Sequence, residues 1–340
     1  MANLGQILAC CRAASVSYCR RMPRARKHLV CLSKTAYYHV SSRCVRRAFL
    51  CGKDIHSGRS YEHRRGWLEE RVRVLSSLFS VELCAYAIMS NHYHLVVRLH
   101  PAESDGWSDD EVLQRWTVLY RGPLLVQRYR DGESLTAAEI ATVRDIAAVY
   151  RRRLGSLSWY MKCLNEPIAR RANAEDGCTG HFWEARFHSQ ALCSKAALLA
   201  AMAYVDLNPV RAGAAPTPEK SNYTSIRARI VNASDGRSPG GNPESLLSSI
   251  DLAVRPLMPF ADEMAGPNDN NRCLPVERRD YFQLVDQTGR IVVHGKRGVL
   301  DTSLAPLLER LGLSRDDWLR CSTSFRAHYR NGDVRRHQSA

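Results

Sequence analysis

The sequence predicts an α+β fold built on an antiparallel sheet. Two apolar, strand-like runs, 81–89 and 92–99, are separated only by Ser90 and Asn91, which suits a tight hairpin turn. An alternating run at 37–42 precedes them, and the segment between carries apolar residues at helical spacing. Strand, helix, strand, strand is the first half of a ferredoxin-like sheet. We therefore expect a ferredoxin-like antiparallel sheet with packed helices.

The first strand leads into a basic loop. Tyr37 to Ser42 is rich in residues that suit a pleated surface. The loop that follows is suited to phosphate contacts, although a merely solvated basic loop has the same composition. Its arginines are Arg43, Arg46 and Arg47.

An amphipathic helix is predicted next, over residues 61–79. Its apolar residues recur every three or four positions, with charges on the opposite face. They are Trp67, Leu68, Val72, Leu75 and Leu78.

The second half of the sheet is expected after a helical insertion at about 101–155, with helical runs at 109–118 and 137–153. A helix over 157–174 and a last strand region over 181–192 follow. Ser194 then caps a helix that extends to Leu207.

The domain division follows from changes in composition. Residues 28–230 form the main predicted domain, and 231–250 read as a linker because turn residues dominate them. Residues 251–340 suggest a small helical C-terminal region, with runs at 281–290 and 304–313. We expect residues 1–27 to be disordered or a non-native extension, with Met22 as an alternative start.

Charge points to a polyanionic partner. The 340 residues carry a formal net charge of +15, and spread positive charge attracts phosphates through counterion release. A basic enzyme of another kind is the alternative. The twelve cysteines show neither a metal-ligand spacing nor a disulfide pattern, which fits a reduced, cytoplasmic protein. We expect no membrane association.

Two histidines begin the third predicted strand. His92 and His94 lie one residue apart, so their side chains share a face of the strand, opposite Tyr93. Two adjacent imidazoles suit a divalent cation. An ordinary pair on a half-buried strand is the alternative.

Four segments, in order, resemble the single-tyrosine HUH transposases, in particular their REP-associated branch. They are Tyr38-His-Val-Ser-Ser-Arg-Cys-Val-Arg-Arg-Ala-Phe49, Met89-Ser-Asn-His-Tyr-His-Leu-Val-Val97, Gly180-His-Phe-Trp-Glu-Ala-Arg-Phe187 and Tyr204-Val-Asp-Leu-Asn-Pro-Val-Arg-Ala-Gly213. The resemblance implies a ferredoxin-like fold, a Mg or Mn ion held by His92 and His94, and a tyrosine that attacks a DNA phosphate.

The nucleophile that the resemblance implies is not where the family has it. On the helix 157–174, Ile168 occupies the position of the tyrosine. Tyr160 lies eight residues earlier, about 12 Å along a helix and roughly 80° around it. It is our tentative catalytic residue, with a packing role as the alternative.

The same helix raises two further questions. Pro167 is expected to kink or restart it. The position that supplies a further metal ligand in the family is Ala172, which leaves Asn173 and Glu166 as weak substitutes.

The predicted function is recognition of single-stranded or hairpin DNA by a transposase-like protein, with metal-dependent strand cleavage and joining through a phosphotyrosine as the family chemistry. Arg43, Arg46, Arg47, Arg186 and Arg211 are the expected nucleic-acid contacts, and Arg186 has a structural salt bridge to Glu184 or Asp206 as its alternative. A cleavage-deficient DNA-binding regulator and an RNA-binding or RNA-processing protein are the alternative functions. A homodimer is expected from the family.

Overall fold

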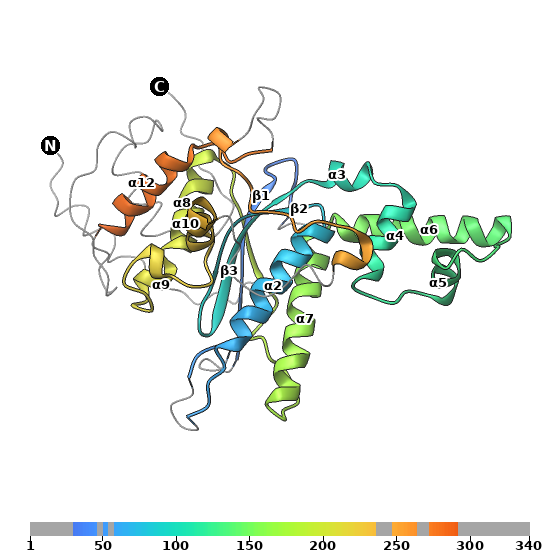
Figure 1. Ribbon diagram of the computed structural model, residues 1–340, viewed down its shortest axis with the longest axis horizontal. Helices are drawn as coiled ribbons and strands as arrows, with labels where there is room; N and C mark the ends of the chain where they lie inside the picture. The colour runs from blue at the N-terminus through green and yellow to red at the C-terminus, as the bar shows by residue number, and fades with distance from the viewer. Residues whose placement is uncertain (1–29, 46–49, 54–57, 236–246, 264–271, 292–340) are drawn as a thin grey trace, which may run out of the picture.

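The computed structural model describes residues 30–45, 50–53, 58–235, 247–263 and 272–291 (Figure 1). Four sequence predictions therefore lie wholly or largely outside the described residues. They are the contacts of Arg46 and Arg47, the extension 1–27, the helical run 304–313 and most of the linker 231–250.

The sheet has four antiparallel strands in the order β2-β3-β1-β4. They are β1 (Tyr37–Arg43), β2 (Val81–Ile88), β3 (His92–Leu99) and β4 (His188–Ala191). Helix α2 (His63–Leu78) connects β1 to β2, and further helices connect β3 to β4. This order and these connections are those of a ferredoxin-like sheet, so the predicted fold class is confirmed.

Helices cover both faces of the sheet (Figure 1). On the first, which we call the α2 face, Tyr93, Leu95 and Val97 pack with α2 and α7 (Leu157–Glu175). On the other, the α8 face, Val96 packs with α8, α10 and α12. These helices span Lys195–Asp206, Ser225–Asp235 and Arg278–Gly289. Because side chains alternate along a strand, His92 and His94 belong to the α8 face.

The insertion between β3 and α7 is helical, as predicted. It consists of α3 (Pro101–Asp105), α4 (Asp109–Thr117), α5 (Leu124–Arg130) and α6 (Ala137–Leu154), and it projects to one side of α2 and α7 (Figure 1). Thr136 and Glu139 form a capping box that fixes the start of α6.

Shorter helices complete the described chain. They are α9 (Asn208–Arg211), η2 (Pro218–Lys220), η3 (Ser248–Ile250) and η4 (Ala261–Glu263). None of the described helices is both long and apolar enough to cross a membrane.

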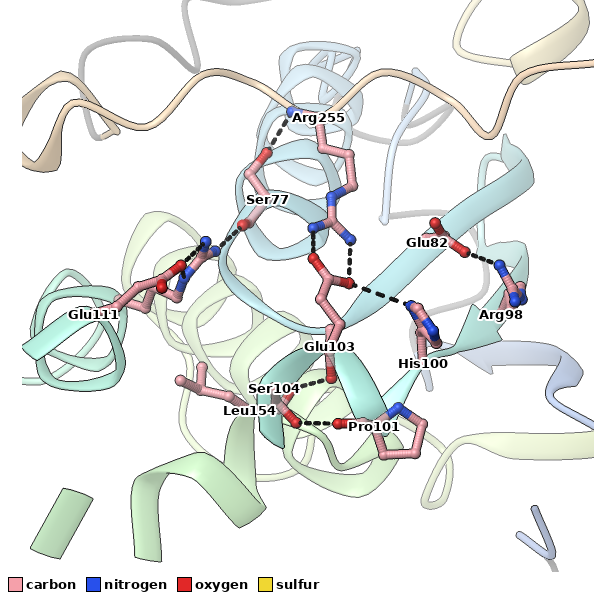
Figure 2. A network of polar contacts seen from close by, with 12 residues as sticks. Ser77, Glu82, Arg98, His100, Pro101, Glu103, Ser104, Glu111, Leu154 and Arg255 are labelled. Carbon is pink, nitrogen blue, oxygen red and sulfur yellow. Dashed lines mark hydrogen bonds and ion pairs between the residues drawn. The ribbon is translucent and has the colours of Figure 1, made fainter. Parts of the chain in front are cut away.

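A polar network ties the chain after η3 to the insertion (Figure 2). The backbone N–H of Arg255 donates to Ser77 Oγ at 2.7 Å, and its guanidinium forms two bonds with Glu103 of α3, one of them 3.1 Å long. Arg115 of α4 donates to the Ser77 carbonyl at 2.7 Å. The last turn of α2 is thus held by Arg255 and by Arg115 of α4, and Glu103 of α3 holds Arg255 in turn.

The last strand is shorter than the sequence predicts. Only 188–191 pair as β4, and the residues before them touch the sheet through an isolated bridge between Cys44 and Trp183. Trp183 lies opposite Cys44 and His188 opposite Ser41, so the chain between them has two more residues than β1 and bulges out of the regular ladder. The Trp183 indole N–H donates to the Asn165 carbonyl of α7 at 2.9 Å.

Pro167 does not interrupt α7, which is helical from Leu157 to Glu175. Proline lacks an N–H, so the Cys163 carbonyl has no helical donor at that position. Arg71 of α2 supplies one, because its Nε donates to this carbonyl at 3.1 Å. The expected restart of the helix is therefore absent.

Candidate nucleic-acid interface

A cleft of about 470 Å³ opens where β1, β3 and the chain entering β4 meet. In the sheet register Arg43 lies opposite His92, and Ser41 lies opposite His188. We call this opening the histidine–arginine cleft. It is lined by His39, Ser41, Ser42, Arg43, His92, Glu184, Ala185, Arg186, His188, Ser189 and Gln190.

The predicted histidine pair lies at this cleft. The rings of His92 and His94 are edge to face, with centroids 4.9 Å apart. His92 is half-buried and lines the cleft, whereas His94 is fully buried behind it. His92 Nδ1 lies 2.5 Å from Asn91 Oδ1, which holds the ring in place.

A third histidine, His39, was not singled out from the sequence. Its Nε2 lies 3.0 Å from His94 Nδ1, and the two rings stack at 5.1 Å. Tyr204 of α8 contacts both rings edge-on, at 5.5 Å from His94 and 6.0 Å from His39. Because side chains alternate along β1, His39 lies on the same face as Ser41 and Arg43. The sequence could have indicated His39 only through the pairing of β1 with β3, which brings this face beside His94.

The predicted metal ligands are two imidazoles. Magnesium and manganese both favour oxygen ligands in an octahedron, whereas imidazole nitrogens are the more usual ligands of zinc, copper, iron and nickel. Within the described part of the chain, no group of three His, Cys, Asp or Glu side chains is placed to hold an ion. The other ligands of an ion at His92 and His94 would have to be amide, water or phosphate oxygens, and the Mg or Mn site stays a prediction.

Two of the predicted arginines lie together in the cleft. Arg43 and Arg186 are both exposed there, although they are far apart in the sequence. The Glu184 N–H donates to the Arg43 carbonyl at 2.9 Å, which brings the two segments side by side. Asp206, one alternative partner of Arg186, is fully buried and accepts bonds from Ser225 and Tyr281 instead.

Arg211 lies elsewhere. Its guanidinium donates to the carbonyls of Thr288 and Ile291 at 2.8 and 2.9 Å, at the C-terminal end of α12. Burial lowers the pKa of this group. Arg211 thus holds α12 in place, and the structure does not bring it to the cleft.

The tentative nucleophile Tyr160 lies on the other side of the sheet. Its side chain is fully buried in the core of the α2 face, and its hydroxyl bonds with Ser76 Oγ at 3.1 Å and the Val72 carbonyl at 3.3 Å. Burial raises the pKa of the phenol, which opposes formation of the attacking phenolate. Ile168 is 4% exposed in the same core.

The two side chains that could substitute for a third metal ligand, Glu166 and Asn173, bond to other groups. Glu166 pairs with Arg170 at 2.5 Å on α7, and Asn173 donates to the Gly180 carbonyl at 3.0 Å. Ala172 is fully buried.

One polar joint connects α7 with the strands beneath the cleft. Asn165 accepts a hydrogen bond from the Tyr93 hydroxyl, and its Nδ2 donates to Ser42 Oγ at 2.9 Å. Its backbone carbonyl accepts from Trp183, three residues before Arg186. Asn165 thus fixes α7 against β1, β3 and the segment that carries Arg186.

No family model matches the chain, and no curated protein matches it. A solved structure similar to this one is that of a REP-associated tyrosine transposase bound to a REP hairpin. The two chains are 12% identical, the match covers 65% of this chain and 93% of the other, and the TM-score is 0.32. A similarity at this level does not establish a shared function.

Proposed function

We propose that this protein is a transposase-like DNA-binding protein that holds the phosphate backbone of single-stranded or hairpin DNA in the histidine–arginine cleft. The observation that carries the proposal is the convergence of the four transposase-like segments. Three supply Arg43, His92 and Arg186 to the cleft, and the fourth places Tyr204 against His94. Segments far apart in sequence thus meet at one polar site.

The electrostatics of the cleft favour a phosphate ligand. Arg43 and Arg186 are exposed, and guanidinium groups bind phosphate oxygens with two parallel hydrogen bonds. His92 and His188 add donors at the same opening. Glu184 is the acid among the lining residues, so the cleft carries a net positive charge.

The burial of Tyr160 favours a protein that binds DNA without forming a covalent phosphotyrosine link through this residue. A nucleophile must lie in line with the phosphate it attacks. Tyr160 lies behind the sheet from the cleft, and its hydroxyl is held by α2. We therefore favour the cleavage-deficient alternative over strand cleavage by Tyr160.

The test compares two double variants in hairpin-DNA binding at several salt concentrations. Arg43→Gln with Arg186→Gln removes both cleft guanidiniums. Arg144→Gln with Lys195→Gln removes two exposed charges outside the cleft and serves as the matched control. Loss of two phosphate contacts should lower the slope of log affinity against log salt by about 1.8 for the cleft variant.

The control should keep the wild-type slope. Equal slopes in the two variants would show that the cleft does not hold phosphates. Competition with RNA of the same hairpin sequence separates the alternatives, because tighter binding of RNA than of DNA would identify an RNA-binding protein.

A further inference from the structure

A second basic hollow lies on the other side of α7, between α2 and the insertion. Its lining includes Arg71 of α2, Tyr120 of the insertion, and Pro167, Arg170 and Arg171 of α7. We call it the α7 hollow. It lies beside the α2 face, whereas the histidine–arginine cleft opens on the α8 face.

Pro167 determines the position of Arg71 in this hollow. Because Pro167 has no N–H, the Cys163 carbonyl lacks a helical donor. It accepts a hydrogen bond from Arg71 Nε at 3.1 Å instead, which fixes the arginine side chain. Burial lowers the pKa of Arg71, which marks the cost of keeping its charge there. An arginine held by Nε still presents its two terminal amino groups as donors.

The neighbouring cations contact aromatic rings. Arg171 lies 3.8 Å from the ring centre of Trp67, and Lys162, one turn before Glu166 on α7, lies 4.7 Å from that of Trp159. Arg153 covers the same Trp159 ring at 4.4 Å. Stacking on rings holds these side chains while leaving their donors at the surface.

These four cations differ from most arginines around them. Within the described residues, Arg71, Arg153, Lys162 and Arg171 form no ion pair with a carboxylate. By contrast, Arg170, in the same hollow, pairs with Glu166, and Arg151, two residues before Arg153, pairs with Asp109. Positive charge without a described carboxylate partner therefore comes from α2, α6 and α7 together.

We propose that the α7 hollow is a second phosphate-binding site for the DNA held in the histidine–arginine cleft, with Arg71 and Arg171 as contacts inside it and Lys162, one turn before the lining residue Glu166, as a contact beside it. The inference rests on the proposed function and extends it. Aromatic rings interleaved with unpaired cations are typical of surfaces that follow a nucleic-acid backbone.

The two sites lie on opposite sides of the sheet, with the sheet and α7 between them. Asn165 of α7 contacts Ser42 beneath the cleft, whereas Pro167, two residues later, lines the hollow. A helix is about 10–12 Å wide and a packed sheet layer adds about 10 Å, so a nucleic acid of several nucleotides can cover the distance around the edge of these layers. DNA that leaves the cleft around α7 therefore meets Arg171 and Arg71.

The test uses the full chain and the double variant Lys162→Gln with Arg171→Gln. Both residues are exposed and make no described hydrogen bond to the core. Arg71 is kept, because it also satisfies the Cys163 carbonyl. The matched control is again Arg144→Gln with Lys195→Gln, and urea unfolding of each variant verifies that the fold is intact.

We expect the hollow variant to lower the salt slope of hairpin binding by about 1.8, so that between 50 and 200 mM salt it loses about twelvefold less affinity than the wild type. Combined with Arg43→Gln and Arg186→Gln, it should lower the slope by about twice as much. A hollow variant with the slope of the control overturns the second site and leaves the cleft proposal standing. Wild-type protein without salt-dependent DNA binding overturns the proposed function itself.

Discussion

Replacing Tyr160 by phenylalanine removes one buried hydroxyl and keeps the ring. The lost bonds join Tyr160 to Ser76 Oγ and to the Val72 carbonyl, both in α2. A buried hydrogen bond contributes about 0.5–1.5 kcal/mol, and Ser76 is 1% exposed, so its hydroxyl has no access to bulk water as a replacement. We expect Tyr160→Phe to lower the free energy of unfolding by about 1–2 kcal/mol.

The ring itself should matter more than the hydroxyl. Tyr160 packs edge to face on Phe79 at 5.5 Å and is fully buried. Tyr160→Ala would leave a cavity in the core of the α2 face, with an expected loss of about 3–5 kcal/mol. Urea unfolding followed by circular dichroism measures both values, and the fit should keep one slope m for the three proteins.

Hairpin DNA provides the functional half of this experiment. Because Tyr160 lies behind the sheet, Tyr160→Phe should bind the hairpin as the wild type does, and neither protein should form an adduct that resists denaturation. A wild-type adduct that disappears in Tyr160→Phe would refute the packing role and identify Tyr160 as the nucleophile.

Three further measurements address other groups. Burial raises the phenol pKa of Tyr86 and Tyr93, so the folded state keeps them protonated while the unfolded state ionises at about pH 10. Stability should therefore fall as the pH rises above that value, with phenolate absorbance appearing together with loss of circular dichroism; phenolate formation in folded protein would contradict this. Asp206→Ala removes the acceptor for two buried hydroxyls and should cost about 3 kcal/mol in urea unfolding, whereas a loss below about 1 kcal/mol would mean that water replaces the carboxylate. In calorimetric titration with manganese we expect only weak heat, abolished by either His92→Ala or His94→Ala; unchanged heat in both variants would reduce the pair to packing residues.

Local sequence determined the elements of this protein because hydrophobic spacing and turn residues act over a few residues. Alternation predicted β1, two apolar runs on either side of the tight turn at Ser90 and Asn91 predicted β2 and β3, and helical spacing predicted α2 and the insertion. Ser194 caps α8 as expected, since its hydroxyl accepts from the Ala197 N–H at 3.1 Å. The shared face of His92 and His94 also followed from strand geometry alone.

Tertiary structure decided which side chains share a site, because this depends on contacts between residues far apart in the chain. Only the pairing of β1 with β3 brings His39 onto His94. The sequence predicts a kink or restart of α7 at Pro167, but the helix continues, and Arg71 of α2 satisfies the carbonyl that the proline leaves without a donor. Arg186 and Arg211 are equally basic in the sequence. One lies in the cleft, whereas the other is bonded to the end of α12, and that difference arises from packing that no local pattern encodes.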